Sequence, residues 1–116
     1  MSYQIHITRK AERDIIEAVD YIEFTLLNPQ ASDHLIDKVD EEIHKLADMP
    51  RKFKIVDDSI LASWGIRMIV ISSYLAFYII DENSKTVHII RFLYQKRNWI
   101  SLLHKESISR QLLGYK

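Results

Sequence analysis

The fold is decided by residues 65–93, GIRMIVISSYLAFYIIDENSKTVHIIRFL, which hold three strand-like runs in close succession. Isoleucine, valine and aromatic residues dominate the runs 65–72, 74–81 and 86–93, and these residue types favour strands. A single serine separates the first two runs, and the polar turn 82–85 separates the last two. Because connections this short join neighbouring antiparallel strands, the stretch predicts an antiparallel meander.

The chain before this meander begins with a strand and continues as a helix. Residues 3–7, YQIHI, alternate between apolar and polar side chains, which is typical of a half-buried strand. Thr8 is then a suitable N-cap for a helix over residues 9–26, where apolar side chains recur every three or four positions. We expect this helix to end near Leu27.

A second helix follows almost at once. Asn28 is a helix cap, and Pro29 fits the first helical position. The apolar stripe of this helix comprises Leu35, Val39, Ile43 and Leu46, and the helix must stop before Pro50. Since only a few residues join the two helices, they are predicted to lie antiparallel as a helical hairpin over residues 9–48.

Together these elements predict one α+β domain over residues 1–116, with two layers and the order β-α-α-β-β-β-α. The hairpin should pack on one face of a small antiparallel sheet made of residues 3–7 and 64–94. Residues 51–63 are a short strand or an irregular crossing segment, and residues 98–116 form a C-terminal tail with a helix. The sheet face away from the hairpin and the strand ends after Leu93 are the places where a site can form.

Composition narrows the class of protein. The 116 residues include no cysteine, which excludes disulfides, thiolate catalysis and cysteine-ligated zinc. No apolar run reaches the ~18–20 residues of a membrane span, and the N-terminus lacks the apolar run of a signal peptide, so a cytoplasmic location without membrane partners is expected. None of the five histidines pairs with another at the i, i+4 spacing of a helical metal site, so neither a metal nor another cofactor is expected.

The net charge of zero conceals a strong asymmetry. Residues 1–50 carry five Lys/Arg and eleven Asp/Glu, a net charge of −6, whereas residues 51–116 carry eleven Lys/Arg and five Asp/Glu, a net charge of +6. Such a division indicates one face for solvent or a protein and another face for an anionic partner. A simpler interpretation of the acidic half is that its helices are solvated.

Two arginines interrupt the apolar strands. Arg67 and Arg91 must face solvent, pair with a carboxylate or line a site, because an unpaired buried charge costs several kcal/mol. The nearby acids Asp57, Asp58 and Asp81 are candidate partners. The other interpretation is a basic patch formed with Lys96 and Arg97, which directly follow the last strand.

Aromatic side chains flank that basic pair. Tyr94 and Trp99 stand on either side of Lys96 and Arg97, and together with Arg91 these residues are candidates for binding a target or RNA. Aromatic rings beside cations suit stacking on RNA bases, and they suit a protein interface equally well.

Four stretches in this order resemble the RelE/ParE family of bacterial type II toxins, also called plasmid stabilisation proteins. They are the opening strand and capped helix YQIHITRKAERDI, the helix ending in Leu46…Met49-Pro50, the run WGIRMIVISSYLAFYII, and the last strand with its basic and aromatic exit, VHIIRFLYQKRNW. The resemblance covers about residues 3–103. It implies a growth-inhibiting toxin encoded beside an antitoxin that wraps helix and strand segments over the toxin surface.

The resemblance leaves the target open, because RelE-like members cut mRNA on the ribosome and ParE-like members poison DNA gyrase. In the nuclease pattern, Arg97 matches the arginine after the last strand and Arg67 is the cation of the preceding strand, while the central arginine position holds Leu75. The C-terminal tyrosine falls near Leu103 or His104, and His104 can replace it as an acid. Leucine cannot stabilise a phosphorane.

The gyrase interpretation is favoured, because a gyrase inhibitor needs a binding surface and no assembled catalytic centre. The alternatives are a metal-independent, ribosome-dependent mRNA endonuclease with Arg97, Arg67 and His104 as catalytic residues, or a nontoxic module that only binds its partner. Enzymatic activity therefore stays open. The basic face from Arg67 to Arg97 predicts an acidic, partly disordered antitoxin that folds on binding.

Overall fold

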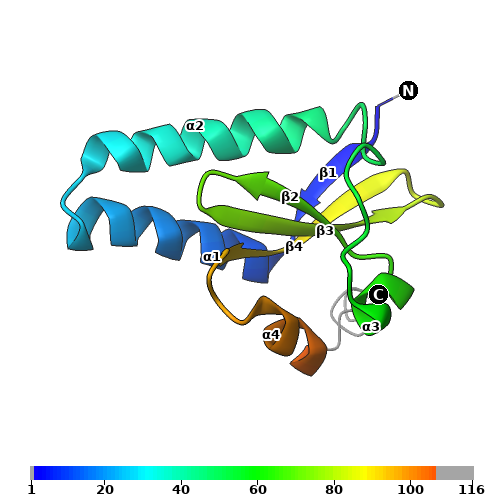
Figure 1. Cartoon of the computed structure of the whole chain (residues 1–116). Coiled ribbons are helices and arrows are strands. Elements are labelled where there is room, and N and C mark those ends of the chain that lie inside the picture. Colours follow the sequence, from blue (N-terminus) through cyan, green and yellow to red (C-terminus); the bar gives the residue numbers. More distant parts are fainter. Residues whose placement is uncertain (1, 107–116) are drawn as a thin grey trace.

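The computed structural model describes residues 2–106 and places helices on both faces of a four-stranded sheet (Figure 1). The strands are β1 (Gln4–Ile7), β2 (Arg67–Ile71), β3 (Tyr74–Asp81) and β4 (Thr86–Tyr94). The helices are α1 (Arg9–Asp20), the π-helical segment η1 (Tyr21–Thr25), α2 (Pro29–Lys45), α3 (Ser59–Ser63) and α4 (Trp99–Lys105). The predicted α+β class and the helical hairpin are confirmed.

The hairpin begins and turns at the predicted capping residues. The hydroxyl oxygen of Thr8 accepts a hydrogen bond from the backbone N–H of Ala11 at 3.2 Å, and the side-chain oxygen of Asn28 accepts one from Ala31 at 3.1 Å. The last turn before the connection is wider than an α-helical turn, since the N–H of Leu26 donates to the carbonyl of Tyr21, five residues earlier, at 3.0 Å. The second helix ends at Lys45, slightly earlier than expected.

The sheet has the strand order β1-β4-β3-β2. The meander of β2, β3 and β4 is antiparallel as predicted, but β1 pairs in parallel with β4, with His6 opposite His88. The sheet is therefore mixed, and the expectation of a wholly antiparallel sheet is corrected. Short connections fix the direction of local strand pairs, whereas the partner of β1 lies 82 residues further along the chain and is selected by tertiary packing.

Two apolar cores lie on opposite faces of the sheet. The first joins the hairpin to the sheet and contains Ala11, Leu35, Val39, Ile43, Leu46, Ile69, Ala76, Tyr78, Val87, Ile89 and Phe92. The second joins α3 and α4 to the other face and contains Val56, Leu61, Ile66, Leu75, Phe77, Ile90, Leu93 and Leu103. Each face of the sheet therefore gains its stability from burial of apolar side chains.

The sequence defined the segments 51–63 and 98–116 least clearly. Each contains a short helix, and the first also contains an isolated strand bridge. In the segment 51–63, Ile55 forms an isolated bridge with Arg67, and Asp58 then caps α3 by accepting a hydrogen bond from Leu61 at 3.1 Å. The predicted C-terminal helix is present as α4, with Asn98 as its N-cap. The remainder of the predicted tail, residues 107–116, lies outside the described residues.

Candidate binding surface

The sheet face away from the hairpin is closed by packing. Helices α3 and α4 cover it, Leu103 of α4 is fully buried there, and the Trp99 ring packs on the Phe77 ring with centroids 5.2 Å apart. The sequence indicated this face as a place where a site can form, and in the structure the two helices cover it. The sequence did not reveal the closure because α3 is only five residues long and α4 only seven, too short for a clear helical period.

Because this face is covered, two positions that hold catalytic residues in the nuclease pattern are buried in this chain. Leu75, at the central cation position, is 5% exposed and belongs to the second core, as does Leu103. A cation at either position would be buried among apolar side chains, where an unpaired charge is costly. The Trp99 ring likewise packs on the covered sheet face.

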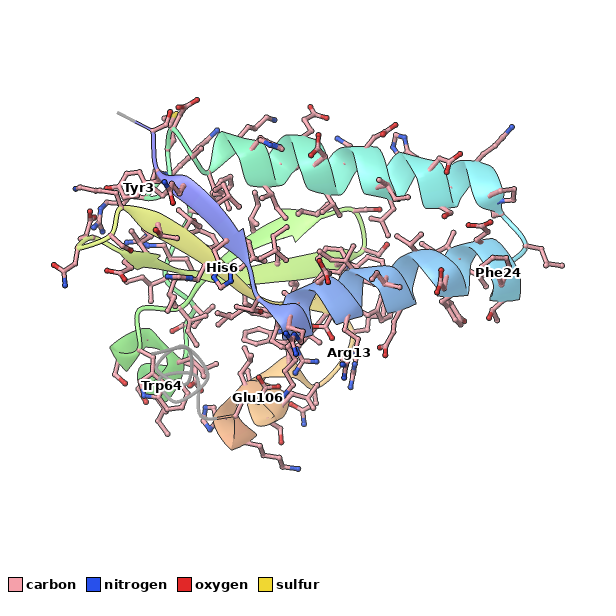
Figure 2. All side chains as sticks on the ribbon, turned by 180° about the vertical axis from the view of Figure 1, so that it is seen from behind. Tyr3, His6, Arg13, Phe24, Trp64 and Glu106 are labelled. Carbon is pink, nitrogen blue, oxygen red and sulfur yellow. The ribbon has the colours of Figure 1, made fainter. Side chains whose placement is uncertain are left out.

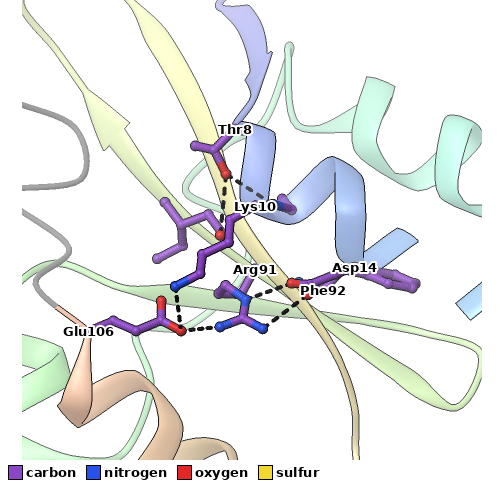
Figure 3. A network of polar contacts seen from close by, with 8 residues as sticks. Thr8, Lys10, Asp14, Arg91, Phe92 and Glu106 are labelled. Carbon is purple, nitrogen blue, oxygen red and sulfur yellow. Dashed lines mark hydrogen bonds and ion pairs between the residues drawn. The ribbon is translucent and has the colours of Figure 1, made fainter. Parts of the chain in front are cut away.

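Arg91 lies in the interior, where a network of carboxylates holds its guanidinium (Figure 3). Its Nε and Nη2 donate to the two carboxylate oxygens of Asp14 at 2.6 Å and 3.0 Å, and its Nη1 donates to Glu106. Lys10 adds a further ion pair with Glu106 at 3.6 Å. Burial alone would lower the pKa of Arg91, but hydrogen bonds and charge from Asp14 and Glu106 raise it above its ordinary value. Arg91 therefore ties α1, β4 and the end of α4 together.

Asp14 has a second role at the edge of the sheet. Its Oδ2 atom also accepts a hydrogen bond from the backbone N–H of Phe92 at 3.0 Å. Strand β1 pairs with β4 only as far as Ile89, so this carboxylate satisfies an edge donor beyond the end of β1. The sequence did not identify Asp14 as the partner of Arg91 because 77 residues separate them.

Arg67 and Arg97 are well separated along the sheet. Arg67 is level with Tyr78 and Ile89 in the strand register, and its Nη1 donates to the carbonyl of Phe53 at 2.5 Å. Arg97 follows Tyr94, which is five residues further along β4, a distance of about 16 Å at about 3.3 Å per residue. The two backbone positions are therefore separated along the strands, and the guanidinium of Arg67 is already engaged by a backbone carbonyl.

His104 pairs with an acidic side chain at the start of α3. Its Nε2 lies 2.7 Å from Oδ2 of Asp58, the residue that caps α3. This hydrogen bond to His104 is the main cause of the lowered pKa of Asp58. The contact joins α3 to α4 and orients an exposed imidazole ring.

Tyr94 and Arg97 do come together, at a groove between the hairpin and the strand ends. We call this the exit groove; its volume is about 670 Å³, and its lining residues are Asp14, Glu17, Ala18, Tyr21, Ile22, Leu26, Ser72, Ser73, Tyr74, Phe92, Tyr94 and Arg97. The Tyr74 ring stacks on Phe92 at 4.9 Å and meets Tyr94 edge-on at 5.7 Å. The pKa of Tyr74 is raised, mainly because the hydroxyl is partly buried and to a lesser extent because Tyr94 and Tyr21 lie nearby.

The exit groove combines apolar and aromatic walls with charges of both signs. Arg97 is exposed, and the exposed Lys96 precedes it in the turn after β4, while Glu17 lines the groove from α1. Of the predicted catalytic and binding residues, Tyr94 and Arg97 line the groove, and the remaining ones do not: Arg67, Arg91, Lys96, Trp99 and His104. The hairpin residues Tyr21, Ile22 and Leu26 were missed, because the sequence gives no sign that the end of the hairpin lies beside the β2–β3 turn.

Two classes of feature are missing from the described part of the chain. Within residues 2–106, no group of three or more His, Cys, Asp or Glu side chains is placed to hold a metal ion. No helix in the same range is long and apolar enough to cross a membrane.

A protein-family model and two solved structures relate this chain to toxin–antitoxin systems. The model of the ParE toxin family, from the parDE type II toxin–antitoxin system, matches residues 5–99. The fold is similar to that of a chromosomal ParDE toxin–antitoxin system from P. aeruginosa, with a TM-score of 0.65 and 16% identity over 80% of this chain and 96% of that one. It is also similar to a chain of the RelBE2 toxin–antitoxin complex from Mycobacterium tuberculosis, with a TM-score of 0.56 and 22% identity over 81% of this chain and 99% of that one. No curated protein sequence matches the chain.

Proposed function

The chain belongs to the ParE toxin family of type II toxin–antitoxin systems, and from this premise we propose that it inhibits growth by binding DNA gyrase. The exit groove is the docking surface in this proposal, with Tyr94 and Arg97 as contact residues and Lys96 beside them. The chain itself needs no catalytic centre for this activity. The cytoplasm, where gyrase acts, is the proposed place of action.

The observation that carries the proposal is the closed second face of the sheet. Cleavage of RNA without a metal requires groups that deprotonate a hydroxyl, stabilise the phosphorane and protonate the leaving oxygen. Leu75 is buried in the second core on the closed face, and Arg67 and Arg97 are well separated along the strands. A binding function, in contrast, uses what the surface offers: a groove with aromatic walls and an exposed cation.

An antitoxin partner follows from the family, and we propose that it is acidic and partly disordered. Lys96 and Arg97 are exposed cations at the strand-end side of the groove, whereas Arg67 donates to a backbone carbonyl and Arg91 is held by Asp14 and Glu106. Electrostatic contact with the antitoxin should therefore concentrate at Lys96 and Arg97. Complex stability that does not change between low and high salt would contradict this contact.

Purified components test the gyrase target. The purified chain should inhibit supercoiling of relaxed plasmid by purified gyrase, and Arg97→Ala should weaken that inhibition. Lys54→Ala serves as the matched control, because Lys54 is an exposed cation that does not line the groove. Undisturbed supercoiling at a large excess of the wild-type chain would refute gyrase as the target.

A second candidate function, cleavage of mRNA on the ribosome, is favoured by one observation. The Asp58–His104 contact orients an imidazole ring, a group able to act as a general acid, on an exposed surface. In this case His104→Ala and Arg97→Ala should each restore growth in cells expressing the chain and abolish mRNA cleavage. Growth that stays blocked in both variants would exclude this candidate, and a wild-type chain without any growth effect would leave only a partner-binding module.

A further inference from the structure

Large apolar side chains gather at the end of the helical hairpin and face solvent. This hairpin tip consists of Tyr21, Phe24, Leu26 and Leu27, and Phe24 and Leu27 are 67% and 78% exposed. Figure 2 shows Phe24 at the end of the hairpin, away from β1 and the short helices. Single exposed apolar residues are ordinary, but four of them in seven consecutive positions form a patch of the kind that marks an interaction site.

The backbone of the hairpin tip is also unfavourable for these residues. Leu27 has a φ of +53°, in the left-handed region where a residue with a Cβ atom is strained. The preceding turn is π-helical, and this geometry is rare in proteins overall but common at functional sites. Glycine or asparagine would adopt this φ more easily, and the exposed leucine gains little burial in return. Contact with another molecule would explain why a leucine stands there.

The hairpin tip and the exit groove are continuous, because Tyr21 and Leu26 belong to both. Charges of opposite sign stand at the groove, with Glu17 on the helix side and Arg97 after β4. A partner that fills the groove must therefore bring an apolar surface, an acidic group opposite Arg97 and a basic group opposite Glu17.

The edge of the sheet beside the groove favours a helical partner over an extended one. An extended segment would have to pair with the open edge of β4, but the Phe92 N–H on that edge already donates to Asp14. A helix satisfies its own backbone groups and needs only a groove for its apolar stripe. The groove is large enough, at about 670 Å³, to hold several side chains of such a stripe.

We propose that the hairpin tip and the exit groove together form one docking surface for an amphipathic helix of gyrase. The apolar stripe of that helix packs on Leu26, Leu27 and Phe24, and its acidic and basic residues face Arg97 and Glu17. The inference rests on the proposed function, since it names the part of the target that the groove accepts.

The strained leucine allows a test that separates docking from folding. Leu27→Asn removes the apolar side chain and places at φ +53° a residue that tolerates this conformation. This variant should unfold at the same or a higher temperature than the wild type, yet inhibit purified gyrase at least tenfold less well. Phe24→Ser should weaken inhibition similarly. Ile60→Ser is the matched control, because Ile60 is an exposed isoleucine on α3, outside both surfaces, and its loss should leave inhibition unchanged.

The outcomes distinguish failure of the inference from failure of the proposed function. A wild-type chain that does not inhibit gyrase overturns both. A wild-type chain that inhibits, with Leu27→Asn and Phe24→Ser equally active, overturns the inference alone. Loss of inhibition in parallel with a lower unfolding temperature also overturns it, because the role would then be structural.

Other occupants of the surface can be recognised in the same set of variants. If Leu27→Asn still inhibits gyrase but is no longer neutralised by the protein encoded next to the chain, the occupant is the antitoxin and the inference is wrong. If the wild type sediments as a dimer and Leu27→Asn as a monomer with full inhibition, the occupant is a second copy of the chain.

Discussion

Replacing Asp14 with asparagine should lower the free energy of unfolding by about 3–5 kcal/mol. The substitution keeps the size of the side chain and one acceptor oxygen for the Phe92 N–H, but it removes the negative charge that faces Arg91. Arg91 and Asp14 are both about one-tenth exposed, so solvent cannot replace the lost partner. Glu106 alone would then balance the guanidinium, and Glu106 also pairs with Lys10.

The magnitude follows from the burial of the pair. Breaking a buried ion pair by removing one member costs about 3–5 kcal/mol, whereas an exposed pair is worth only about 0–1 kcal/mol. For a domain of this size, 1 kcal/mol corresponds to about 4 °C in Tm, so Tm should fall by about 12–20 °C. The matched control is Glu12→Gln on the exposed side of the same helix, which should change stability by no more than about 0.5 kcal/mol.

Urea unfolding at pH 7, followed by tryptophan fluorescence, measures these differences. A double-mutant cycle of Asp14→Asn and Arg91→Met should give a coupling energy of about 2 kcal/mol or more, since each change removes the same contact. A loss below about 1 kcal/mol for Asp14→Asn, or a coupling energy near zero, would refute the assignment of Arg91 as a buried tie between α1, β4 and α4.

Three further predictions concern the sheet. Leu75→Arg places a charge in the second core, so thermal melts should show a free energy of unfolding lower by several kcal/mol, and the variant should gain no RNase activity. A stable variant that cleaves RNA would contradict the closed face. Burial and the facing His6 lower the pKa of His88, so the folded state binds fewer protons than the unfolded state and stability should fall as the pH drops below about 6.5. His88→Gln should flatten this pH dependence of stability in urea titrations between pH 5 and 8. An unchanged slope would count against the role of His88. Tyr78→Phe removes a buried hydrogen bond of 2.7 Å to the Pro50 carbonyl and should cost about 1 kcal/mol of unfolding free energy, whereas a change within the error of the melt would mean that the bond is not formed.

The parts of the fold that the sequence predicts well depend on local chemistry. Thr8 and Asn28 cap the helices because their side chains accept hydrogen bonds from backbone N–H groups three residues ahead. The short connections in the meander, the serines between β2 and β3 and the ENSK turn between β3 and β4, allow only antiparallel pairing of neighbouring strands. The parallel pairing of β1 with β4 has no local signal. It depends on how the hairpin packs, and the apolar alternation of residues 3–7 fits either direction of pairing.

The candidate site was predictable where it follows a strand end and unpredictable where it depends on the tertiary structure. Tyr94 and Arg97 follow the last strand, and the groove contains both. Arg91 could be recognised as a charge that needs a partner, but the partners Asp14 and Glu106 are brought to it by α1 and α4 from distant positions. Leu27 carries no sequence signal at all, because only its φ and its exposure set it apart.

The most direct test of the central claim is a pulse-label experiment. The chain is expressed in a bacterial host without its antitoxin, and incorporation of labelled thymidine and labelled amino acid is followed over the first minutes. Action on gyrase predicts that DNA synthesis falls first while protein synthesis continues. Protein synthesis that falls first would contradict the claim and would make the ribosome the target.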